Sequence, residues 1–247
     1  MKRISLIVPC LNEEEAIPAF KQEIDRVFKE CLEGYAPELI FVDDGSTDRS
    51  LEMIKKMAEH SPEVKFISFS RNFGKEAAIY AGLEAATGDY AAVMDVDLQD
   101  PPSLLPDMLK AIEKEGYDCA GTRRVTRQGE PLLRSFFARA FYKTIHQISD
   151  TRIVDGARDY KLMTRPVLEA LLSLKEYNRF SKGLYEWVGF RTKWFEYENV
   201  ERVAGETKWS FFKLFLYSIE GIVAFSTAPL ALASIIGVLL SFISFLS

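Results

Sequence analysis

The sequence predicts an α/β fold: a mainly parallel sheet flanked by helices, with a transmembrane segment at the C-terminal end. Three observations predict it. Over residues 1–120, short apolar runs alternate with segments whose apolar residues recur at helical spacing. The apolar runs are continuous, as in strands that are buried on both faces of a parallel sheet. Residues 221–247 carry no charged residue and form a run long enough to cross a bilayer.

The expected strands and helices alternate along the chain. Apolar runs predict strands at residues 4–8, 39–42, 64–68, 90–94 and 118–121. Helical spacing predicts helices at residues 14–31, 75–86 and 104–115, and another that ends at Met57. Ligands bind at the carboxyl ends of the strands in such sheets. We therefore expect the polar residues that follow the strands to gather at one edge of the sheet.

Composition narrows the class of protein. The chain has 247 residues, 48% hydrophobic and 27% charged, as in a globular protein of one or two domains. Its net charge of −5 gives no reason to expect nucleic-acid binding. Cys10, Cys31 and Cys119 lie far apart without a CxxC pair, which indicates packing residues in a reducing cytosol. His60 and His146 are isolated, so neither a histidine metal site nor a Ser-His-Asp triad is expected.

The uncharged run at residues 221–247 predicts a membrane anchor. About 20 apolar residues span a bilayer, and a buried core helix of this length without charge is the weaker interpretation. Met1-Lys2-Arg3 leads into only a short apolar run, so we expect no cleavable signal and a cytoplasmic soluble part. Because the chain stops within the apolar run, we also expect it to be part of a longer protein.

A basic segment with aromatic residues occupies residues 122–143. Its one acidic residue is Glu130, and its aromatic residues are Phe136, Phe137, Phe141 and Tyr142. Two interpretations remain open: a solvated basic face over a core stripe, and an amphipathic helix on an anionic membrane surface. Residues 208–213 combine lysines with aromatic residues just before the apolar run, which is typical of an interfacial anchor.

Two carboxylates and an amide follow the expected strand at residues 90–94. Asp95, Asp97 and Gln99 occupy alternate positions, so their oxygen atoms converge if the chain is extended here. Such oxygens are the ligands that Mg²⁺ prefers, commonly together with substrate phosphates. The alternative is a polar turn, since Pro101 and Pro102 end the run.

A pair of aspartates follows the expected strand at residues 39–42. Asp43 or Asp44 can accept hydrogen bonds from a ribose or a base edge, while Ser46 or Thr47 caps the next helix. The alternative is a plain turn followed by a helix cap.

Polar clusters also follow the first and third expected strands. Residues 9–14 end in acidic residues that would equally suit the first turn of a helix. Residues 70–75 can present Arg71 and backbone N–H groups to a phosphate or a base, or form an ordinary loop.

Together, these clusters resemble the inverting family 2 glycosyltransferases of GT-A fold. The resemblance rests on P-x-x-N-E, D-D-G-S-T-D, S-R-N-F-G-K and D-x-D-L-Q-D-P-P, followed by the basic segment and the apolar run. It is close to the branch that acts on polyprenyl phosphates, including undecaprenyl-phosphate glucosyltransferases and dolichyl-phosphate mannose synthases. It implies transfer of a hexose, from UDP-glucose or UDP-N-acetylglucosamine, to undecaprenyl phosphate at the cytoplasmic face of the inner membrane. It also implies Mg²⁺ or Mn²⁺ as cofactor and a homo-oligomer such as a tetramer.

The resemblance assigns roles to individual residues. The nucleotide sugar is expected at Pro9, Leu11, Glu13, Asp43, Asp44, Arg71 and Asp95. The metal is expected at Asp95, Asp97 and Gln99, with Asp97 also catalytic. The acceptor phosphate is expected at Arg123, Arg134, Arg202 and Lys208, and residues 205–209 resemble a loop that closes near the site. These roles divide the chain into a nucleotide-sugar half at residues 1–122, an acceptor half with interfacial helices at 123–220, and the membrane segment at 221–247.

Residues 156–163 look like the G-D-F-R-L-M segment of the family, which makes Asp159 a catalytic base or an acceptor-orienting group. Arg158 stands where the family frequently has glycine. A phosphate monoester has a second pKa of about 6, so the acceptor is already ionised and needs no strong base. We therefore expect Asp159 mainly to orient the acceptor or the sugar hydroxyls; the alternative is an ion pair with Arg158 or Lys161.

Two other functions remain open on the sequence. One is a glycosyltransferase that acts on a different envelope acceptor, although the Q-x-x-R-W motif of processive synthases is missing from the chain. The other is a membrane-tethered sensor of nucleotide sugars without activity. The intact Asp95, Asp97, Gln99 and Asp159 argue against the sensor.

Overall fold

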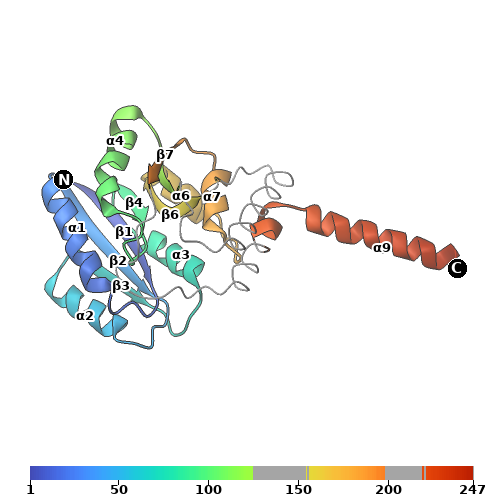
Figure 1. The fold of residues 1–247 in the computed structure, drawn as a ribbon, viewed down its shortest axis with the longest axis horizontal. Helices are drawn as coiled ribbons and strands as arrows, with labels where there is room; N and C mark the ends of the chain where they lie inside the picture. Colours follow the sequence, from blue (N-terminus) through green and yellow to red (C-terminus); the bar gives the residue numbers. More distant parts are fainter. Residues whose placement is uncertain (125–153, 155, 198–218, 220, 247) are drawn as a thin grey trace.

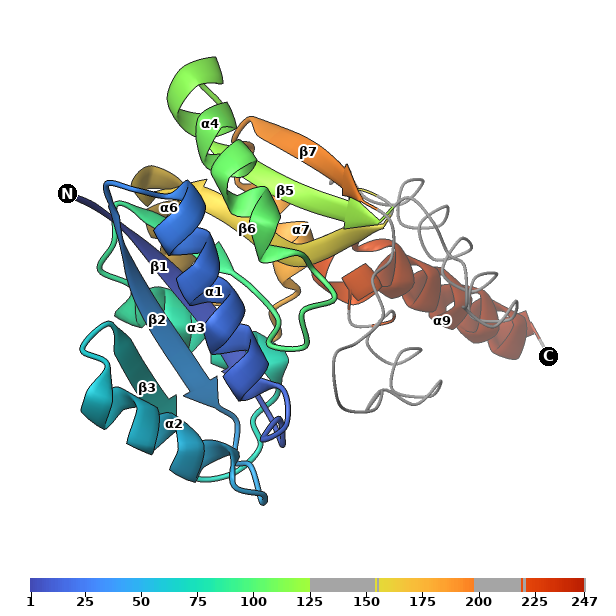
Figure 2. The ribbon, with the colours of Figure 1, turned by 60° about the vertical axis from the view of Figure 1, so that its left-hand side comes forward.

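The computed structural model describes residues 1–124, 154, 156–197, 219 and 221–246. Within these residues the chain forms a seven-stranded sheet in the order β3-β2-β1-β4-β6-β5-β7, with helices on both faces (Figures 1 and 2). The strands are β1 (Lys2–Cys10), β2 (Tyr35–Asp43), β3 (Val64–Ser68), β4 (Tyr90–Val93), β5 (Cys119–Arg124), β6 (Ala157–Thr164) and β7 (Thr192–Tyr197).

The sheet is mainly parallel, as predicted. β1 pairs in parallel with β2 and β4, β2 with β3, and β5 with β7. β6 is the exception, because it runs antiparallel to both of its neighbours, β4 and β5. β1 has β2 on one side and β4 on the other, so the strand order reverses beside it, the usual place for a ligand in an open α/β sheet.

The two faces of the sheet are covered by different helices. α1 (Ile17–Cys31), α2 (Ser50–His60) and α4 (Leu105–Glu115) pack on one core, together with Leu6 and Phe41. α3 (Lys75–Ala85), α6 (Arg165–Ser173) and α7 (Ser181–Trp187) pack on the other, together with Ile7 and Val42. Alternate residues of a strand thus serve opposite cores, which explains the continuous apolar runs. A short 3₁₀ turn, η1 (Pro102–Leu104), precedes α4.

A glycine lets α3 approach β1 closely. A Cβ at Gly82 would lie 2.3 Å from Ile7 Cγ2, well inside van der Waals contact. The close packing fixes α3 against the centre of the sheet. Its first residue, Lys75, is thereby placed near the carboxyl ends of β1 and β4.

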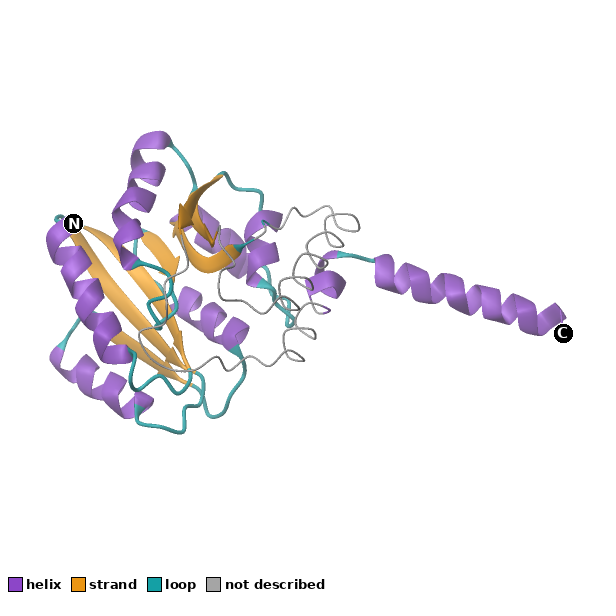
Figure 3. Ribbon diagram, viewed as in Figure 1, coloured by secondary structure: helices purple, strands orange, loops and turns teal. Residues whose placement is uncertain are grey.

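The apolar run at residues 221–247 is not one continuous helix. Residues 221–225 are helical, and α9 (Ala228–Leu246) follows after a break in which Ser226 Oγ accepts a hydrogen bond from Ala228 N at 3.1 Å (Figure 3). Phe225 packs on α7, with its ring 6.3 Å from that of Trp187. α9 has 19 residues, a mean hydropathy of 2.3 and no buried residue, so it is a candidate membrane span. Of the predicted basic segment at residues 122–143, residues 122–124 belong to β5, so a helix from residue 122 is wrong there. The rest of that segment and the predicted interfacial anchor at residues 208–213 lie outside the described residues.

Candidate active site

Four polar loops meet at the carboxyl edge of the parallel strands, as the sequence predicts. The loops after β1 and β2 are joined by hydrogen bonds. Asn12, whose φ is 52°, donates its N–H to Ser46 Oγ at 2.9 Å and accepts from Thr47 N at 2.7 Å. Glu13 N donates to Ser50 Oγ at 2.7 Å. Pro9 lies near the end of β1, and Leu11 follows in this loop.

The predicted cap of α2 is wrong. The helix begins at Ser50, whose N–H donates to Asp48 Oδ1 at 2.9 Å, and neither Ser46 nor Thr47 caps it. Both residues instead contact Asn12 of the neighbouring loop. A partner 34 positions away in the sequence has displaced the local capping interaction.

The two aspartates at the end of β2 are buried, and Asp44 connects this loop to the one after β3. Asp44 Oδ1 accepts a hydrogen bond from Phe73 N at 2.6 Å, and its Oδ2 accepts one from Gly74 N at 2.9 Å. Asp43 Oδ1 accepts from Ser46 N at 3.3 Å. The two loops are so close that a Cβ at Gly45, where φ is +75°, would lie 2.6 Å from Arg71 C. The N–H groups that were expected to face a phosphate therefore bind Asp44.

Arg71 lies on the ring of the nearby Phe73. Its guanidinium carbon is 4.0 Å from the ring centroid, and its Nη1 donates to Asn72 O at 3.0 Å. Arg71 as a whole is exposed. The role of Arg71 in nucleotide binding remains a prediction.

The expected extension of residues 95–99 is wrong. β4 ends at Val93, the chain turns at Val96 and Asp97, and Leu98 takes a φ of 56°. Gln99 N donates to Asp97 Oδ1 at 3.1 Å within this turn. Alternate residues share a face only in an extended chain, so the spacing alone does not align these oxygen atoms. Asp97 is nearly buried, with 6% of its surface exposed.

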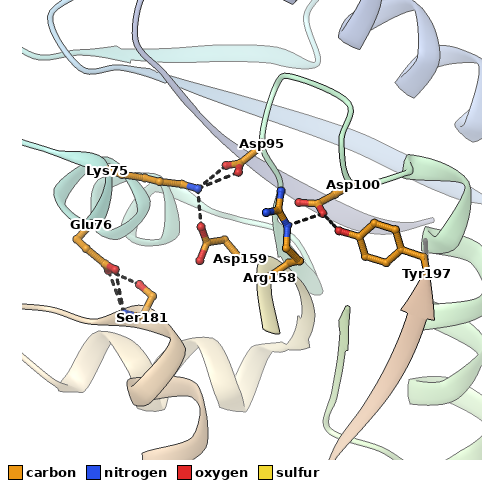
Figure 4. Close-up of polar contacts among 8 residues, drawn as sticks. All are labelled: Lys75, Glu76, Asp95, Asp100, Arg158, Asp159, Ser181 and Tyr197. Carbon is orange, nitrogen blue, oxygen red and sulfur yellow. Dashed lines mark hydrogen bonds and ion pairs between the residues drawn. The ribbon is translucent and has the colours of Figure 1, made fainter. Parts of the chain in front are cut away.

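Lys75 joins two of the predicted site residues (Figure 4). Its Nζ lies 2.7 Å from Asp95 Oδ1 and 2.5 Å from Asp159 Oδ2. Burial alone would raise the pKa of Asp159, but the ammonium of Lys75 outweighs it and holds that pKa well below its usual range. The expected alternative for Asp159, a pair with Arg158 or Lys161, is not the one formed. Sequence reasoning overlooked Lys75, although it ends the S-R-N-F-G-K motif.

A second ion pair lies beside the first. Arg158 Nε is 2.9 Å from Asp100 Oδ1, and Tyr197 Oη donates a short hydrogen bond to the same oxygen (Figure 4). Asp100 is fully buried. This pair ties the turn after β4 to β6 and to the end of β7. The arginine that departs from the family pattern therefore has a partner within the turn that carries Asp95 and Asp97.

The basic residues expected to bind the acceptor are placed only in part. Arg123, in β5, forms an ion pair with Glu196 of β7, and 40% of its side chain is exposed. Arg134, Arg202 and Lys208 lie outside the described residues. The loop expected to close near the site, at residues 205–209, lies outside them as well.

The donor atoms in this region fit a divalent cation by their chemistry. Within the described part of the chain, no three His, Cys, Asp or Glu side chains are grouped so as to hold a metal ion. Asp95 and Asp97 nevertheless supply carboxylate oxygens and Gln99 an amide oxygen, the donors that Mg²⁺ and Mn²⁺ accept. Asp95 already binds a cation, the ammonium of Lys75. The turn after β4 thus has oxygen donors of the right kind and attracts a positive charge.

Comparison with known proteins identifies relatives along almost the whole chain. Residues 5–172 match the family described as "Glycosyl transferase family 2". The bactoprenol glucosyl transferase of Shigella phage SfV is 42% identical over 244 residues, which cover 99% of this chain and 78% of that protein. The prophage bactoprenol glucosyl transferase homolog of Escherichia coli (strain K12) is 41% identical over 244 residues, which cover 99% of this chain and 79% of that protein.

A solved structure shares the fold. Glucosyl-3-phosphoglycerate synthase from Mycobacterium tuberculosis, in complex with Mn²⁺, UDP-glucose and phosphoglyceric acid, superposes with a TM-score of 0.54 at 21% sequence identity. The match covers 88% of this chain and 76% of that one. The fold is therefore of GT-A type, and the family match shows that the chain belongs to glycosyl transferase family 2.

Proposed function

We propose that this glycosyltransferase moves a hexose, glucose in the first place, from a UDP-sugar to undecaprenyl phosphate or a related polyprenyl phosphate. One observation carries the proposal: the 42% identity, over 99% of the chain, to a relative named bactoprenol glucosyl transferase. UDP-N-acetylglucosamine is the second candidate donor. The product is a lipid-linked sugar that serves cell-envelope glycosylation.

The donor lies at the carboxyl edge of the sheet in this proposal. Its nucleotide binds among the ends of three strands and the loops that follow them. Pro9, Leu11 and Glu13 belong to the first, Asp43 and Asp44 to the second, and Arg71 to the third. Asp95, Asp97 and Gln99 would hold Mg²⁺ or Mn²⁺, and the bound cation would supply charge stabilisation to the departing diphosphate. Support for the metal comes from the oxygen donors of this turn and from the Mn²⁺ in a structural neighbour.

The acceptor phosphate attacks the anomeric carbon from the side opposite the diphosphate, which leaves with inversion. The nucleophile is already an anion, because its second pKa is about 6. Asp159 is bound to Lys75 at 2.5 Å, so its carboxylate is held ionised and is a weak proton acceptor. Both facts favour an orienting role for Asp159. Arg123, Arg134, Arg202 and Lys208 are proposed to offset the repulsion between the two anionic substrates.

The membrane supplies the acceptor. α9 is long and apolar enough to cross a bilayer, and a lipid phosphate at the cytoplasmic face would meet the enzyme beside it. We propose the inner or plasma membrane as the location, with the sheet domain in the cytoplasm. A homo-oligomer, such as a tetramer, belongs to the same proposal.

A panel of donors tests the function directly. The purified protein in detergent is mixed with undecaprenyl phosphate, Mg²⁺ or Mn²⁺, and UDP-glucose, UDP-N-acetylglucosamine or GDP-mannose in turn. We expect a glycolipid product with UDP-glucose, and we expect no product to form when EDTA is present from the start. Release of the nucleoside diphosphate without a lipid product would indicate another acceptor. Neither a lipid product nor release of UDP or GDP with any donor would contradict the proposal.

A further inference from the structure

Lys75 is held in place on both sides by its neighbours in the chain. Gly74 N, just before it, donates to Asp44 Oδ2 at 2.9 Å. Glu76, just after it, accepts hydrogen bonds from Ser181 N at 3.1 Å and from Ser181 Oγ at 2.5 Å (Figure 4). The start of α3 is thus fixed to the loop after β2 and to α7. The fold therefore sets the position of the Lys75 backbone, and the side chain reaches Asp95 and Asp159 from there.

The ammonium of Lys75 occupies both oxygens of Asp95. Nζ lies 2.7 Å from Oδ1 and 2.9 Å from Oδ2, and 2.5 Å from Asp159 Oδ2. An ammonium has three hydrogens and no acceptor, so two neighbouring carboxylates are its natural partners. Without it, the two carboxylates would repel each other in a site where only 23% of the Asp95 and 14% of the Asp159 side chain is exposed.

We propose that Lys75 is a positioning residue that holds Asp95 and Asp159 together and competes with the divalent cation for Asp95. The inference rests on the proposed function for the role of Asp95 as a metal ligand. An ammonium and a hard cation bind the same carboxylate oxygens, and both oxygens of Asp95 contact Lys75. Asp159 remains as a partner for the ammonium when Asp95 is shared. Lys75 would therefore weaken metal binding and at the same time keep Asp159 in place.

Removal of the ammonium should affect metal affinity and turnover in opposite directions. Lys75→Gln frees Asp95 and removes a positive charge that repels the metal ion. We therefore expect Mn²⁺ to bind about tenfold more tightly, which corresponds to about 1.4 kcal/mol. The same variant leaves Asp159 without its partner, so turnover should fall. A substitution that merely disturbed the packing would weaken both properties.

Mn²⁺ binding is measured by electron paramagnetic resonance on the full chain in detergent, without sugar nucleotide. Lys75→Arg retains the positive charge and should bind Mn²⁺ with an affinity close to that of the wild type. Lys56→Gln is the matched control, because Lys56 is exposed on α2 and the substitution changes the net charge equally. An unchanged or weaker Mn²⁺ affinity in a folded Lys75→Gln protein would overturn the proposal.

A second measurement avoids any folding defect, because it uses the wild-type protein. Lysines are acetylated briefly with acetic anhydride, and the label at each lysine is quantified by mass spectrometry with and without saturating Mn²⁺. We expect labelling of Lys75 to rise with Mn²⁺ and that of Lys56 to stay constant. Constant labelling of Lys75 would count against competition for Asp95. Neither measurement needs an acceptor lipid, so failure of the donor panel alone would leave this inference standing.

Discussion

Asp159 lies level with Asp95 at the carboxyl edge of the sheet because β6 runs antiparallel to β4. Val93 of β4 pairs with Lys161 of β6, so Asp159, two residues before Lys161, sits beside Asp95, two residues after Val93. In a parallel strand, the same residue at the start of β6 would lie at the opposite edge. Strand direction therefore brings a residue of the second half of the chain to the polar cluster of the first half.

This arrangement predicts unequal effects of two substitutions at the site. Asp159→Asn keeps the shape and removes the charge of the group proposed to orient the acceptor, so turnover should fall about tenfold. Asp97→Ala should lower turnover at least about a hundredfold. Initial rates of lipid-linked product, with both substrates saturating, measure the difference. An equal loss in the two variants would show that Asp159 does more than orient.

The pair of Arg158 and Asp100 should support the stability of the protein. Arg158→Ala leaves the fully buried Asp100 without its cation, and removal of one partner of a buried pair costs about 3 kcal/mol. Chemical unfolding followed by circular dichroism measures this loss. Arg26→Ala, at an exposed pair on α1, is the control and should change little. If Arg158→Ala lost no more stability than Arg26→Ala, the Arg158 pair would contribute nothing to the stability of the turn after β4.

Asp44 should govern nucleotide binding through the loop after β3. Asp44→Asn replaces one acceptor oxygen with a donor, so the N–H of either Phe73 or Gly74 loses its partner, and UDP affinity should fall about tenfold. Calorimetric titration with UDP gives the affinity. Asp107→Asn, at an exposed position of α4, is the matched control. Equal UDP affinities in the two variants would show that the loop after β3 plays no part in nucleotide binding.

Glu38 lies on β2 away from the site, and it should make the stability of the protein sensitive to acid. Burial would raise its pKa, but Lys65, Ser5 and Thr87 outweigh that effect and lower it from 4.5 to about 2. The unfolded chain thus binds more protons than the folded one between these values, so stability is lost as pH falls from about 4.5 to about 2. The full shift corresponds to about 3 kcal/mol.

Glu38→Gln tests this dependence because its side chain cannot titrate. The variant should be less stable than the wild type at pH 7 and should approach it as the pH is lowered through this range. Urea unfolding at several pH values gives both curves. A constant difference between them would rule out titration of Glu38 as the cause. Activity at neutral pH should be retained, since Glu38 lies in the first half of β2 and the aspartates of the site lie at the end of that strand.

The first four strands and the helices around them could be predicted because their signals are local. An apolar run such as residues 39–42 sits within β2, and the apolar spacing of residues 14–31 gave α1, which begins at Ile17. Parallel strands place their carboxyl ends together, so the clusters at Asp43, Asp95 and residues 9–14 were correctly assigned to one edge. The details inside each loop were less predictable. The alternate spacing of Asp95, Asp97 and Gln99 predicts an extended chain, but the chain turns at Leu98. Ser46 is predicted to cap a helix, but it binds Asn12.

By itself, the sequence determined the α/β class, the edge where the polar clusters meet, and the motifs that mark the family, because each depends on residues close together in the chain. Only the tertiary structure decided the direction of β6 and the partners of the charged groups. Lys75 is 20 positions from Asp95 and 84 from Asp159, and Arg158 is 58 positions from Asp100. No local pattern specifies such pairs. They arise because packing of α3 on β1, and of β6 beside β4, brings opposite charges into a partly buried site where each needs a partner.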